Sequence, residues 1–316
     1  MSSALSSQAS RALCVTRNPS LRRAVRRTLS AVGTAVDFAD ELNDANADGA
    51  ALIIVDHESR RGGDEKLVEI AGPQGKIIVI GDSLEDDEVI ALLRHRSMDH
   101  LISDLDDGDE RELVVTSVKL MGGDIFGLDK YLAWGVRILE QPIRSYEDKR
   151  RALTDVSAYA KEVGARRQLV SRIESVTDEL LMNALYDAPA IRHGDSREAR
   201  VAKSSETVLS AEETALLRFG SDGRYLAVSV QDNYGELHKE AILDNLSRAR
   251  ADRGRPITGA GTGGAGLGLY FILSAATRFI ANIEPGKRTE VICLFDLCQS
   301  GRDATTCAQS LHIFHT

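Results

Sequence analysis

A glycine-rich run at residues 259–271 is the first segment of the chain whose residue types suit chemistry. It holds six glycines in ten residues and then becomes apolar and helix-compatible. Because glycine lacks a Cβ, its backbone can bring N–H groups close to an anion, and a helix that begins where the glycines end adds partial positive charge. The run therefore predicts a phosphate cradle, with a flexible surface loop as the alternative.

Glu179 and Asn183 are the next candidates, and they stand four residues apart in a predicted helix over residues 167–186. This spacing places both side chains on one side of the helix, one turn apart. A carboxylate in that position could hold a water or a hydroxyl, and an amide could hold a hard cation. The alternative is the ordinary polar edge of an amphipathic helix.

Two further candidates lie near strand ends. The predicted strand at 225–230 leads to Asp232, and an acid beside a turn at a strand end is a natural acceptor for an exocyclic amine. A turn at 285–288 then leads into a closing strand that carries Thr289. The four segments thus follow one another as helix, strand end, glycine run and closing strand.

In this order the segments resemble the GHKL superfamily of gyrase, heat-shock chaperone, histidine-kinase and mismatch-repair ATPases. The resemblance covers roughly residues 145–297 and implies an α/β two-layer sandwich that binds ATP and Mg²⁺. The family's boxes and its adenine-pocket threonine fall on Glu179, Asn183, Asp232, Gly235, Gly264, Gly266, Gly268 and Thr289. The resemblance implies that Asp232 takes the adenine amino group, that the glycines close over the phosphates and that Asn183 holds Mg²⁺.

The G1 box of this chain departs from the family's D-x-G-x-G pattern. It reads Asp232-Asn233-Tyr234-Gly235-Glu236, so both glycine positions carry side chains. These side chains either narrow the adenine pocket or replace glycine flexibility with a fixed turn. The stretch at 236–263 corresponds to the family's ATP lid.

The branch of the family that the chain resembles is that of the anti-sigma-factor serine kinases. No histidine stands between residues 145 and 177, where a histidine kinase needs its substrate histidine. The resemblance then implies transfer of the γ-phosphoryl group to a Ser or Thr of a regulatory protein partner, with Glu179 as the catalytic base. The alternative is a non-catalytic ATP-dependent conformational switch, or a scaffold, in a two-component-like signalling pathway.

Residues 12–121 alternate between short apolar runs and amphipathic helical patterns. The runs at 12–16, 35–38, 51–56, 76–81 and 100–103 predict a doubly wound parallel five-stranded sheet. Their order resembles the receiver domain of two-component proteins, whose phosphoacceptor position falls on Asp56. Arg17 and Asn18 replace that family's metal-binding acids. We therefore predict a pseudo-receiver that serves for interaction or dimerisation, with Asp56 a relic or a structural cap.

The remaining segments complete the predicted organisation. A disordered N-terminus at 1–11, a connector at 122–144 and a C-terminal tail at 298–316 flank the two domains. Trp134, in the connector, is predicted to be a core residue, and the seven histidines are predicted to lie at the surface or in loops. A helix from Ser145 to Val163 is predicted to begin with a cap between Ser145 and Asp148.

Composition limits the classes of function. The net charge of -9 argues against a nucleic-acid partner. No apolar run approaches membrane-spanning length, which predicts no membrane insertion. The four cysteines show neither C-x-x-C nor zinc-ligand spacing. We therefore expect a cytoplasmic protein with a protein partner, and a homodimer remains open.

Overall fold

The computed structural model describes residues 10–44, 47, 49–72, 75–81, 86–103, 105, 110–194, 209–251, 267–298 and 310–316. The chain divides into two compact units, Met1–Leu84 with Ala91–Asp124 and Glu85–Ile90 with Ile125–Thr316. Both units combine helices with strands, which confirms the predicted α/β class. Among the described residues, no helix has the length and apolar character needed to cross a membrane.

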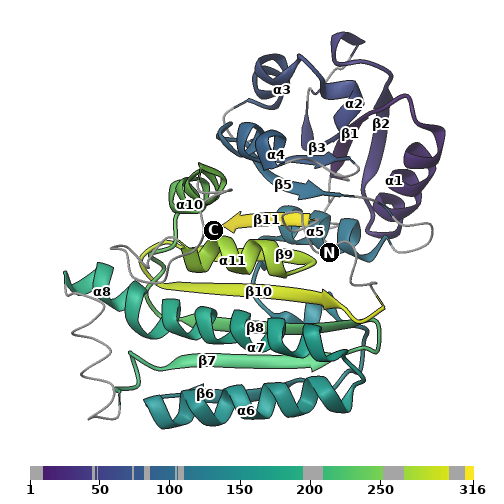
Figure 1. The fold of residues 1–316 in the computed structure, drawn as a ribbon. Helices are drawn as coiled ribbons and strands as arrows, with labels where there is room; N and C mark the ends of the chain where they lie inside the picture. The colour runs from purple at the N-terminus through teal and green to yellow at the C-terminus, as the bar shows by residue number, and fades with distance from the viewer. Residues whose placement is uncertain are drawn as a thin grey trace, which may run out of the picture. The chain divides into compact units, whose positions relative to one another are not determined.

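The first unit contains five strands in the order β2-β1-β3-β4-β5, and every neighbouring pair is parallel. They are β1 (Arg11–Val15), β2 (Ala35–Ala39), β3 (Ala50–Asp56), β4 (Ile77–Ile80) and β5 (Met98–Ile102), as Figure 1 shows. The strands β1, β3 and β4 are apolar almost throughout because their residues are buried on both faces of the sheet. Each lies where the sequence pattern predicts it.

Helices connect these strands. They are α1 (Pro19–Ala31), the short turn η1 (Leu42–Asp44), α2 (His57–Arg60), α3 (Asp64–Ala71) and α4 (Asp86–Leu93), whose residues are divided between the first and the second unit. The helix α5 (Arg111–Gly122) follows β5. The start of α1 is fixed by Asn18, whose side chain accepts hydrogen bonds from the N–H groups of Ser20 (2.9 Å) and Leu21 (3.3 Å). Pro19 follows at the first helical position, where its missing N–H costs nothing.

The second unit contains a mixed sheet in the order β11-β9-β10-β8-β7-β6. Its strands are β6 (Leu139–Ile143), β7 (Ala215–Ser221), β8 (Tyr225–Asp232), β9 (Arg278–Glu284), β10 (Arg288–Asp296) and β11 (Ser310–His315). Neighbouring strands are antiparallel except for β11 and β9, which are parallel. Turns therefore join β7 to β8 and β9 to β10 directly.

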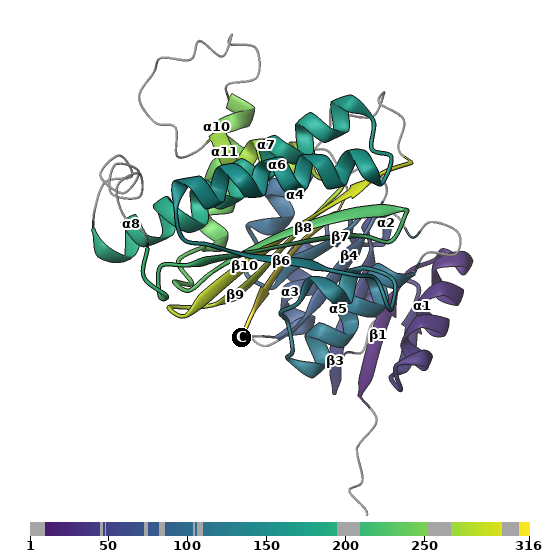
Figure 2. The ribbon, with the colours of Figure 1, turned by 90° about the horizontal axis from the view of Figure 1, so that it is seen from below.

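Helices cover one face of this sheet, as Figure 2 shows for α6 and α7. The helical elements are η2 (Leu128–Tyr131), α6 (Tyr146–Glu162), α7 (Arg167–Met182), the π-helical turn η3 (Asn183–Asp187), α8 (Ala188–His193), α10 (Lys239–Ala251) and α11 (Leu267–Ala275). The predicted cap of α6 is confirmed, because the Asp148 N–H donates to Ser145 Oγ over 3.1 Å. The apolar faces of α6 and α7 pack together and form the core of the helical layer.

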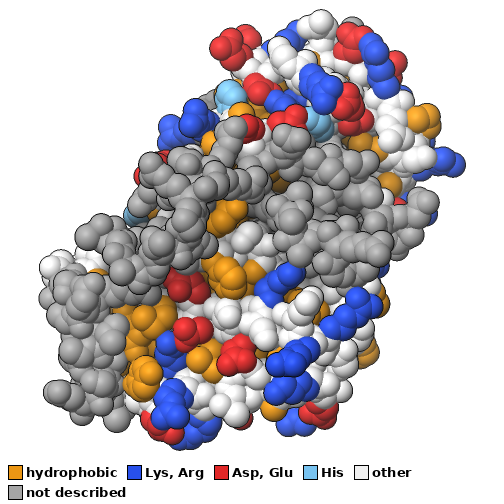
Figure 3. Space-filling view, viewed as in Figure 1, with side chains coloured by type: hydrophobic (Ala, Val, Ile, Leu, Met, Phe, Trp, Pro, Cys, Tyr) orange, Lys and Arg blue, Asp and Glu red, His pale blue; other side chains and the backbone are white. Residues whose placement is uncertain are grey.

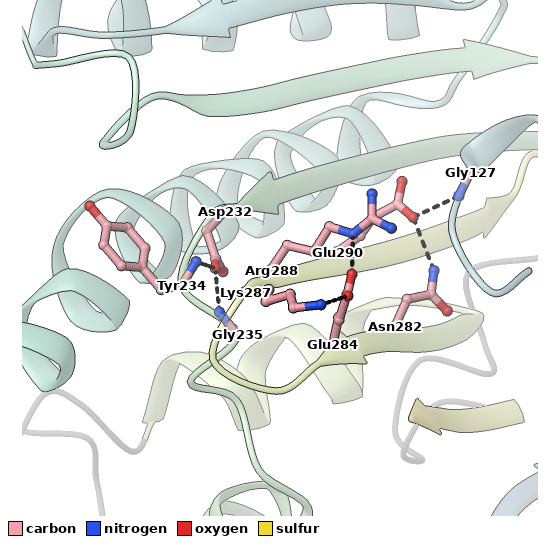
Figure 4. A network of polar contacts seen from close by, with 9 residues as sticks. All are labelled: Gly127, Asp232, Tyr234, Gly235, Asn282, Glu284, Lys287, Arg288 and Glu290. Atoms are coloured by element: carbon pink, nitrogen blue, oxygen red, sulfur yellow. Dashed lines mark hydrogen bonds and ion pairs between the residues drawn. The ribbon is translucent and has the colours of Figure 1, made fainter. Parts of the chain in front are cut away.

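Side chains of β10 that point away from the face of Thr289 hold the segment that precedes η2. Side chains alternate along a strand, so Glu290 points away from the face that carries Thr289. The Glu290 carboxylate is fully buried and accepts hydrogen bonds from the Gly127 N–H (2.8 Å) and Asn282 Nδ2 (3.0 Å), as Figure 4 shows. Arg288 stacks 3.8 Å from the centre of the Phe126 ring. These contacts attach the connector to the sheet.

Three predictions about single segments are wrong. Trp134 is not a core residue but is fully exposed, because it stands in a turn in which the Val136 N–H donates to Ala133 O over 3.2 Å. The predicted C-terminal tail contains β11, which pairs with β9. Not all histidines lie at the surface, because His57, His100 and His312 are buried.

Candidate functional site

A cavity of about 340 Å³ opens in the second unit between η3, α10 and the ends of β8 and β10. Most of its wall is apolar. Its polar wall residues are Asn183, Asp187, Asp232, Glu236, Asn245 and Thr289. Three of the predicted site residues (Asn183, Asp232 and Thr289) are therefore brought to one cavity by elements that are far apart in the sequence.

Asp232 is the last residue of β8, and its carboxylate shapes the turn that follows. Its Oδ1 accepts hydrogen bonds from the N–H groups of Tyr234 (2.8 Å) and Gly235 (3.2 Å), as Figure 4 shows. Burial raises the pKa of the Asp232 carboxyl to about 6, although the hydrogen bonds from Tyr234, Gly235 and Thr289 lower it, and the nearby Glu236 carboxylate raises it further. The fold thus holds a carboxyl group in the cavity that is poorly solvated and close to its titration point at neutral pH.

Thr289 lies directly opposite Asp232 in the pairing of β10 with β8. Its side chain is 2% exposed, and its hydroxyl has no hydrogen-bond partner among the described residues. Buried hydroxyl groups almost always have a partner, so an unpaired one in a cavity wall is a group that a ligand or water can satisfy. The antiparallel register explains how two residues 57 positions apart face one cavity.

Asn183 begins the π-helical turn at the end of α7. The Ala188 N–H donates to Asn183 O, five residues back, and Pro189 then offers no N–H to continue an α-helical ladder. With its amide nitrogen facing the neighbouring acids, Asn183 donates to Asp187 Oδ2 (2.9 Å) and to Glu179 Oε1 (3.3 Å). In that orientation the amide oxygen is left as an acceptor.

Glu179 lies one turn before Asn183, as predicted, and its carboxylate packs against Gly268 of α11. A Cβ built on Gly268 would lie 1.7 Å from Glu179 Oε1, so a side chain at position 268 would force the carboxylate to move. Glu179 itself is half-buried and does not line the cavity. The structure therefore brings Glu179 and Gly268 together next to Asn183, at the start of α11.

The turn that follows Asp232 is constrained by its contact with the turn between β9 and β10. Gly235, in the turn after β8, adopts φ +67°, and a Cβ there would lie 2.3 Å from Glu284 O, so the close approach of the turn between β9 and β10 requires glycine at position 235. Glu236 follows with its side chain in the cavity wall, where Arg192 Nη1 donates to its Oε1 over 3.1 Å. The departure from the D-x-G-x-G pattern predicts that position 236 carries a side chain, but it does not predict the ion pair of Glu236 with Arg192.

Other predicted site residues lie outside the described residues, and some wall residues were not predicted. Gly264 and Gly266 of the glycine run, and residues 252–263 of the predicted lid, belong to the part of the chain that the structure does not describe, whereas residues 236–251 of the lid are described and contain α10. Asp187 lines the cavity without having been predicted, and Glu236 and Asn245, which belong to the predicted lid at 236–263, line it without having been assigned a role as site residues. Among the described residues, no three His, Cys, Asp or Glu side chains form a group that could hold a metal ion.

Asp56, in the first unit, has a structural role. Its Oδ2 accepts from Thr16 Oγ1 (2.8 Å), and its Oδ1 accepts from the Glu58 N–H (3.1 Å) as the cap of α2. Directly after β1, Arg17 forms an ion pair with Glu41, and Asn18 caps α1. Both oxygens of Asp56 are therefore engaged by groups of the protein itself.

On the face drawn in Figure 3, described basic side chains are interspersed with acidic and apolar ones. Several arginines of the first unit have acidic partners, including Arg22 with Asp40 and Arg27 with Glu110.

Comparison with known proteins gives little further guidance. No protein-family model matches the chain, and no curated protein matches it. Twelve chains of solved structures match. One of them, described as the SiaB–SiaC complex from Pseudomonas aeruginosa, is 16% identical, with 51% of this chain and 89% of that chain covered and a TM-score of 0.32.

Proposed function

We propose that the second unit binds ATP with Mg²⁺ and transfers the γ-phosphoryl group to a serine or threonine of a regulatory protein partner. The observation that carries this proposal is that Asn183, Asp232 and Thr289 line one cavity. These are the residues on which the N box, the G1 box and the adenine-pocket threonine of the GHKL superfamily fall. The first unit, as a pseudo-receiver, would regulate this activity.

The cavity suits an adenine ring. Its walls are largely apolar, which favours burial of a flat aromatic ring, and its polar groups are few. The Asp232 carboxylate is an acceptor for the exocyclic amine. The unpaired Thr289 hydroxyl can donate to a ring nitrogen, either directly or through a water. A ring without an amine would be poorly matched, because the Asp232 carboxylate would then lack the ligand's donor and keep only the hydrogen bonds from Tyr234, Gly235 and Thr289.

The residues around Asn183 suit a magnesium ion that is shared with phosphates. Mg²⁺ in nucleotide sites keeps several waters and takes only one or two protein ligands, so a single amide oxygen is sufficient. Bound Mg²⁺ neutralises charge that develops on the transferred group. The hydrogen bonds from the Asn183 amide nitrogen to Asp187 and Glu179 fix the orientation of its oxygen.

Glu179 is the group proposed to take the proton from the attacking hydroxyl. Its carboxylate is half-buried and is held beside Asn183 and Gly268. Removing its charge should leave ATP affinity nearly unchanged, because Glu179 does not line the cavity, but should lower phosphoryl transfer. Loss of a general base typically lowers the rate by about a hundredfold to ten-thousandfold.

The test combines calorimetry and phosphoryl transfer. We expect the wild type to bind ATP more tightly with Mg²⁺ than without it, Glu179→Gln to bind ATP but not transfer phosphate, and Asn183→Ala to lose the Mg²⁺-dependent part of the affinity. Glu174→Gln is the matched control, because Glu174 stands on the same helix, is exposed and accepts from Ser157 Oγ over 2.8 Å. Loss of ATP binding in Glu179→Gln alone would place this residue in the binding site rather than in the chemistry.

A non-catalytic ATP-dependent switch is the second candidate. It is favoured by the hydrogen bond from the Asn183 amide to Glu179 Oε1, which engages the proposed base within the protein. In this case nucleotide binding would change the affinity for a partner without any transfer. Tight ATP binding by the wild type, with neither transfer to a protein nor hydrolysis, would decide for the switch.

A further inference from the structure

Asn245 presents an acceptor atom to the cavity, and the proposed function assigns no role to this atom. It stands in the middle of α10, is 6% exposed and lines the cavity. Its Nδ2 donates to Ala241 O of the same helix over 2.6 Å, which fixes the orientation of the amide. Among the described residues, its Oδ1 has no hydrogen-bond partner.

A buried acceptor without a partner destabilises a fold, and such groups are therefore rare unless a ligand or water satisfies them. The Asn245 oxygen cannot be satisfied by exchanging the two ends of its amide, because the nitrogen would then lose Ala241 O as its acceptor. A ligand that fills the cavity and displaces water from this oxygen should therefore bring a hydrogen-bond donor to Asn245.

The chemistry of ATP limits the choice of donor. Its only hydrogen-bond donors are the exocyclic amine and the two ribose hydroxyls. The amine is assigned to Asp232, at the end of β8 in the sheet. Asn245 instead lies on the helix that leads toward the glycine run predicted to close over the phosphates. The ribose is the part of the nucleotide that joins the base to the phosphates.

We propose that Asn245 is a ribose-binding residue, whose Oδ1 accepts a hydrogen bond from the 2′- or 3′-hydroxyl and makes the site selective for ribonucleotides. This inference rests on the proposed function, because it takes the base to lie at Asp232. It gives α10, which already lines the cavity, a direct contact with the nucleotide. A bound nucleotide would then hold α10 against the sheet through the sugar.

The experiment compares ATP with 2′-deoxy-ATP and 3′-deoxy-ATP on the full chain by calorimetry. We expect the wild type to bind one of the two deoxynucleotides about tenfold more weakly than ATP, because removing the donor leaves the buried Asn245 oxygen unpaired. The deoxynucleotide that binds more weakly identifies the hydroxyl group that contacts Asn245. Equal affinity of the wild type for all three nucleotides would overturn the proposal without any variant.

Two variants separate binding from folding. Asn245→Leu, which has nearly the same size, should bind ATP about tenfold more weakly and should no longer distinguish ATP from the deoxynucleotide. Asp244→Asn, at the exposed neighbouring position of α10, should behave as the wild type. A loss in Asn245→Leu that is equal for all three nucleotides would indicate a structural role and overturn the proposal.

The outcomes also separate this inference from the proposed function. Purine riboside triphosphate lacks the exocyclic amine, and we compare its affinity with that of ATP in the wild type and in Asn245→Leu. If the variant loses the preference for ATP over this compound, and not the preference over the deoxynucleotide, the Asn245 oxygen contacts the base and the ribose assignment is wrong. If the wild type, shown by circular dichroism to be folded, binds no nucleotide at all, the proposed function fails and the inference fails with it.

Discussion

At the scale of single residues, burial keeps the Asp232 carboxyl in an environment that disfavours its charge. Its pKa is raised to about 6 mainly by desolvation. Because the pKa of Asp232 is higher in the folded state than in the unfolded chain, the protonated carboxyl stabilises the fold. This stabilisation is fully present below the pKa of the unfolded chain and is lost as the pH rises through about 6. A group that destabilises the fold at neutral pH is typical of a functional position.

We therefore expect Asp232→Asn to change how stability depends on pH. The asparagine oxygen can still accept from Tyr234 and Gly235, but it carries no charge. Between roughly pH 4 and pH 7 the wild type should lose about 2–3 kcal/mol of unfolding free energy relative to this variant. Urea unfolding at a series of pH values measures the difference. Parallel curves for the two proteins would show that the carboxyl titrates normally.

Asp56 is the residue for which the structural role and the signalling role make opposite predictions. Because both oxygens accept hydrogen bonds from Thr16 and Glu58, Asp56→Ala should destabilise the chain by about 1–2 kcal/mol, and Asp56→Asn should cost less because it retains the cap. Acetyl phosphate with Mg²⁺ should not label Asp56. A stable aspartyl-phosphate mapped to this residue by mass spectrometry would show instead that the position is a phosphoacceptor.

At the scale of elements, β10 connects the candidate site with the connector. Thr289 faces the cavity, and the next residue, Glu290, holds the Gly127 N–H on the other face of the sheet. Arg218 Nη1 lies 3.7 Å from the second carboxylate oxygen of Glu290. A displacement of the connector would therefore act on the strand that carries a wall residue of the cavity.

Removing the Glu290 side chain should be costly. Glu290→Ala leaves the Gly127 N–H and Asn282 Nδ2 without their buried acceptor, and we expect a loss of about 3 kcal/mol in unfolding free energy, with faster hydrogen exchange at the Gly127 amide. Glu140→Gln is the control, because Glu140 is an exposed partner of the same Arg218 (2.7 Å) and should matter by no more than about 0.5 kcal/mol. Similar losses of unfolding free energy in both variants would mean that Glu290 stabilises the fold through its ion pair with Arg218 and not by holding the connector.

The elements also show where sequence reasoning succeeds and where it ends. The strands of the first unit are short apolar runs buried on both faces, and α7 has a long amphipathic pattern, so each could be predicted. The strand β6 could not, because Pro142 argues against a strand unless the strand lies at a sheet edge, as β6 does. The strand β11 could not either, because its apolar run gains meaning only from its pairing with β9.

The candidate site was predictable to the extent that it follows local motifs. Asp232 and Thr289 stand at a strand end and after a turn, and Glu179 with Asn183 follows the helical period. Asn245 gives no such signal, because an asparagine in the middle of a helix is an unremarkable residue until the fold places it at a cavity. The ion pair of Arg192 with Glu236 likewise depends on the approach of α8 to the turn that follows β8.

At the scale of the whole molecule, the two compact units should respond differently to nucleotide, and the cysteines offer a probe of each. Cys14 lies in β1 of the first unit and Cys293 in β10 of the second, and both are fully buried. Burial raises the pKa of the Cys14 thiol to about 12 and also raises the pKa of Cys293. Cys298 is exposed. A thiol reagent should therefore modify Cys298 at once and the two buried thiols only when their units open.

Because the labelling rate of a buried thiol follows the population of the open form, ATP should slow the labelling only where it binds. At a hundredfold excess over its Kd, a ligand stabilises the state that binds it by about 2.7 kcal/mol, which corresponds to about a hundredfold slower labelling. We expect this decrease at Cys293, four residues along β10 from Thr289, and no change at Cys14. Peptide mapping by mass spectrometry measures both rates in one sample. Equal slowing at both thiols would show that the units open together, and unchanged labelling at Cys293 would contradict ATP binding in the second unit.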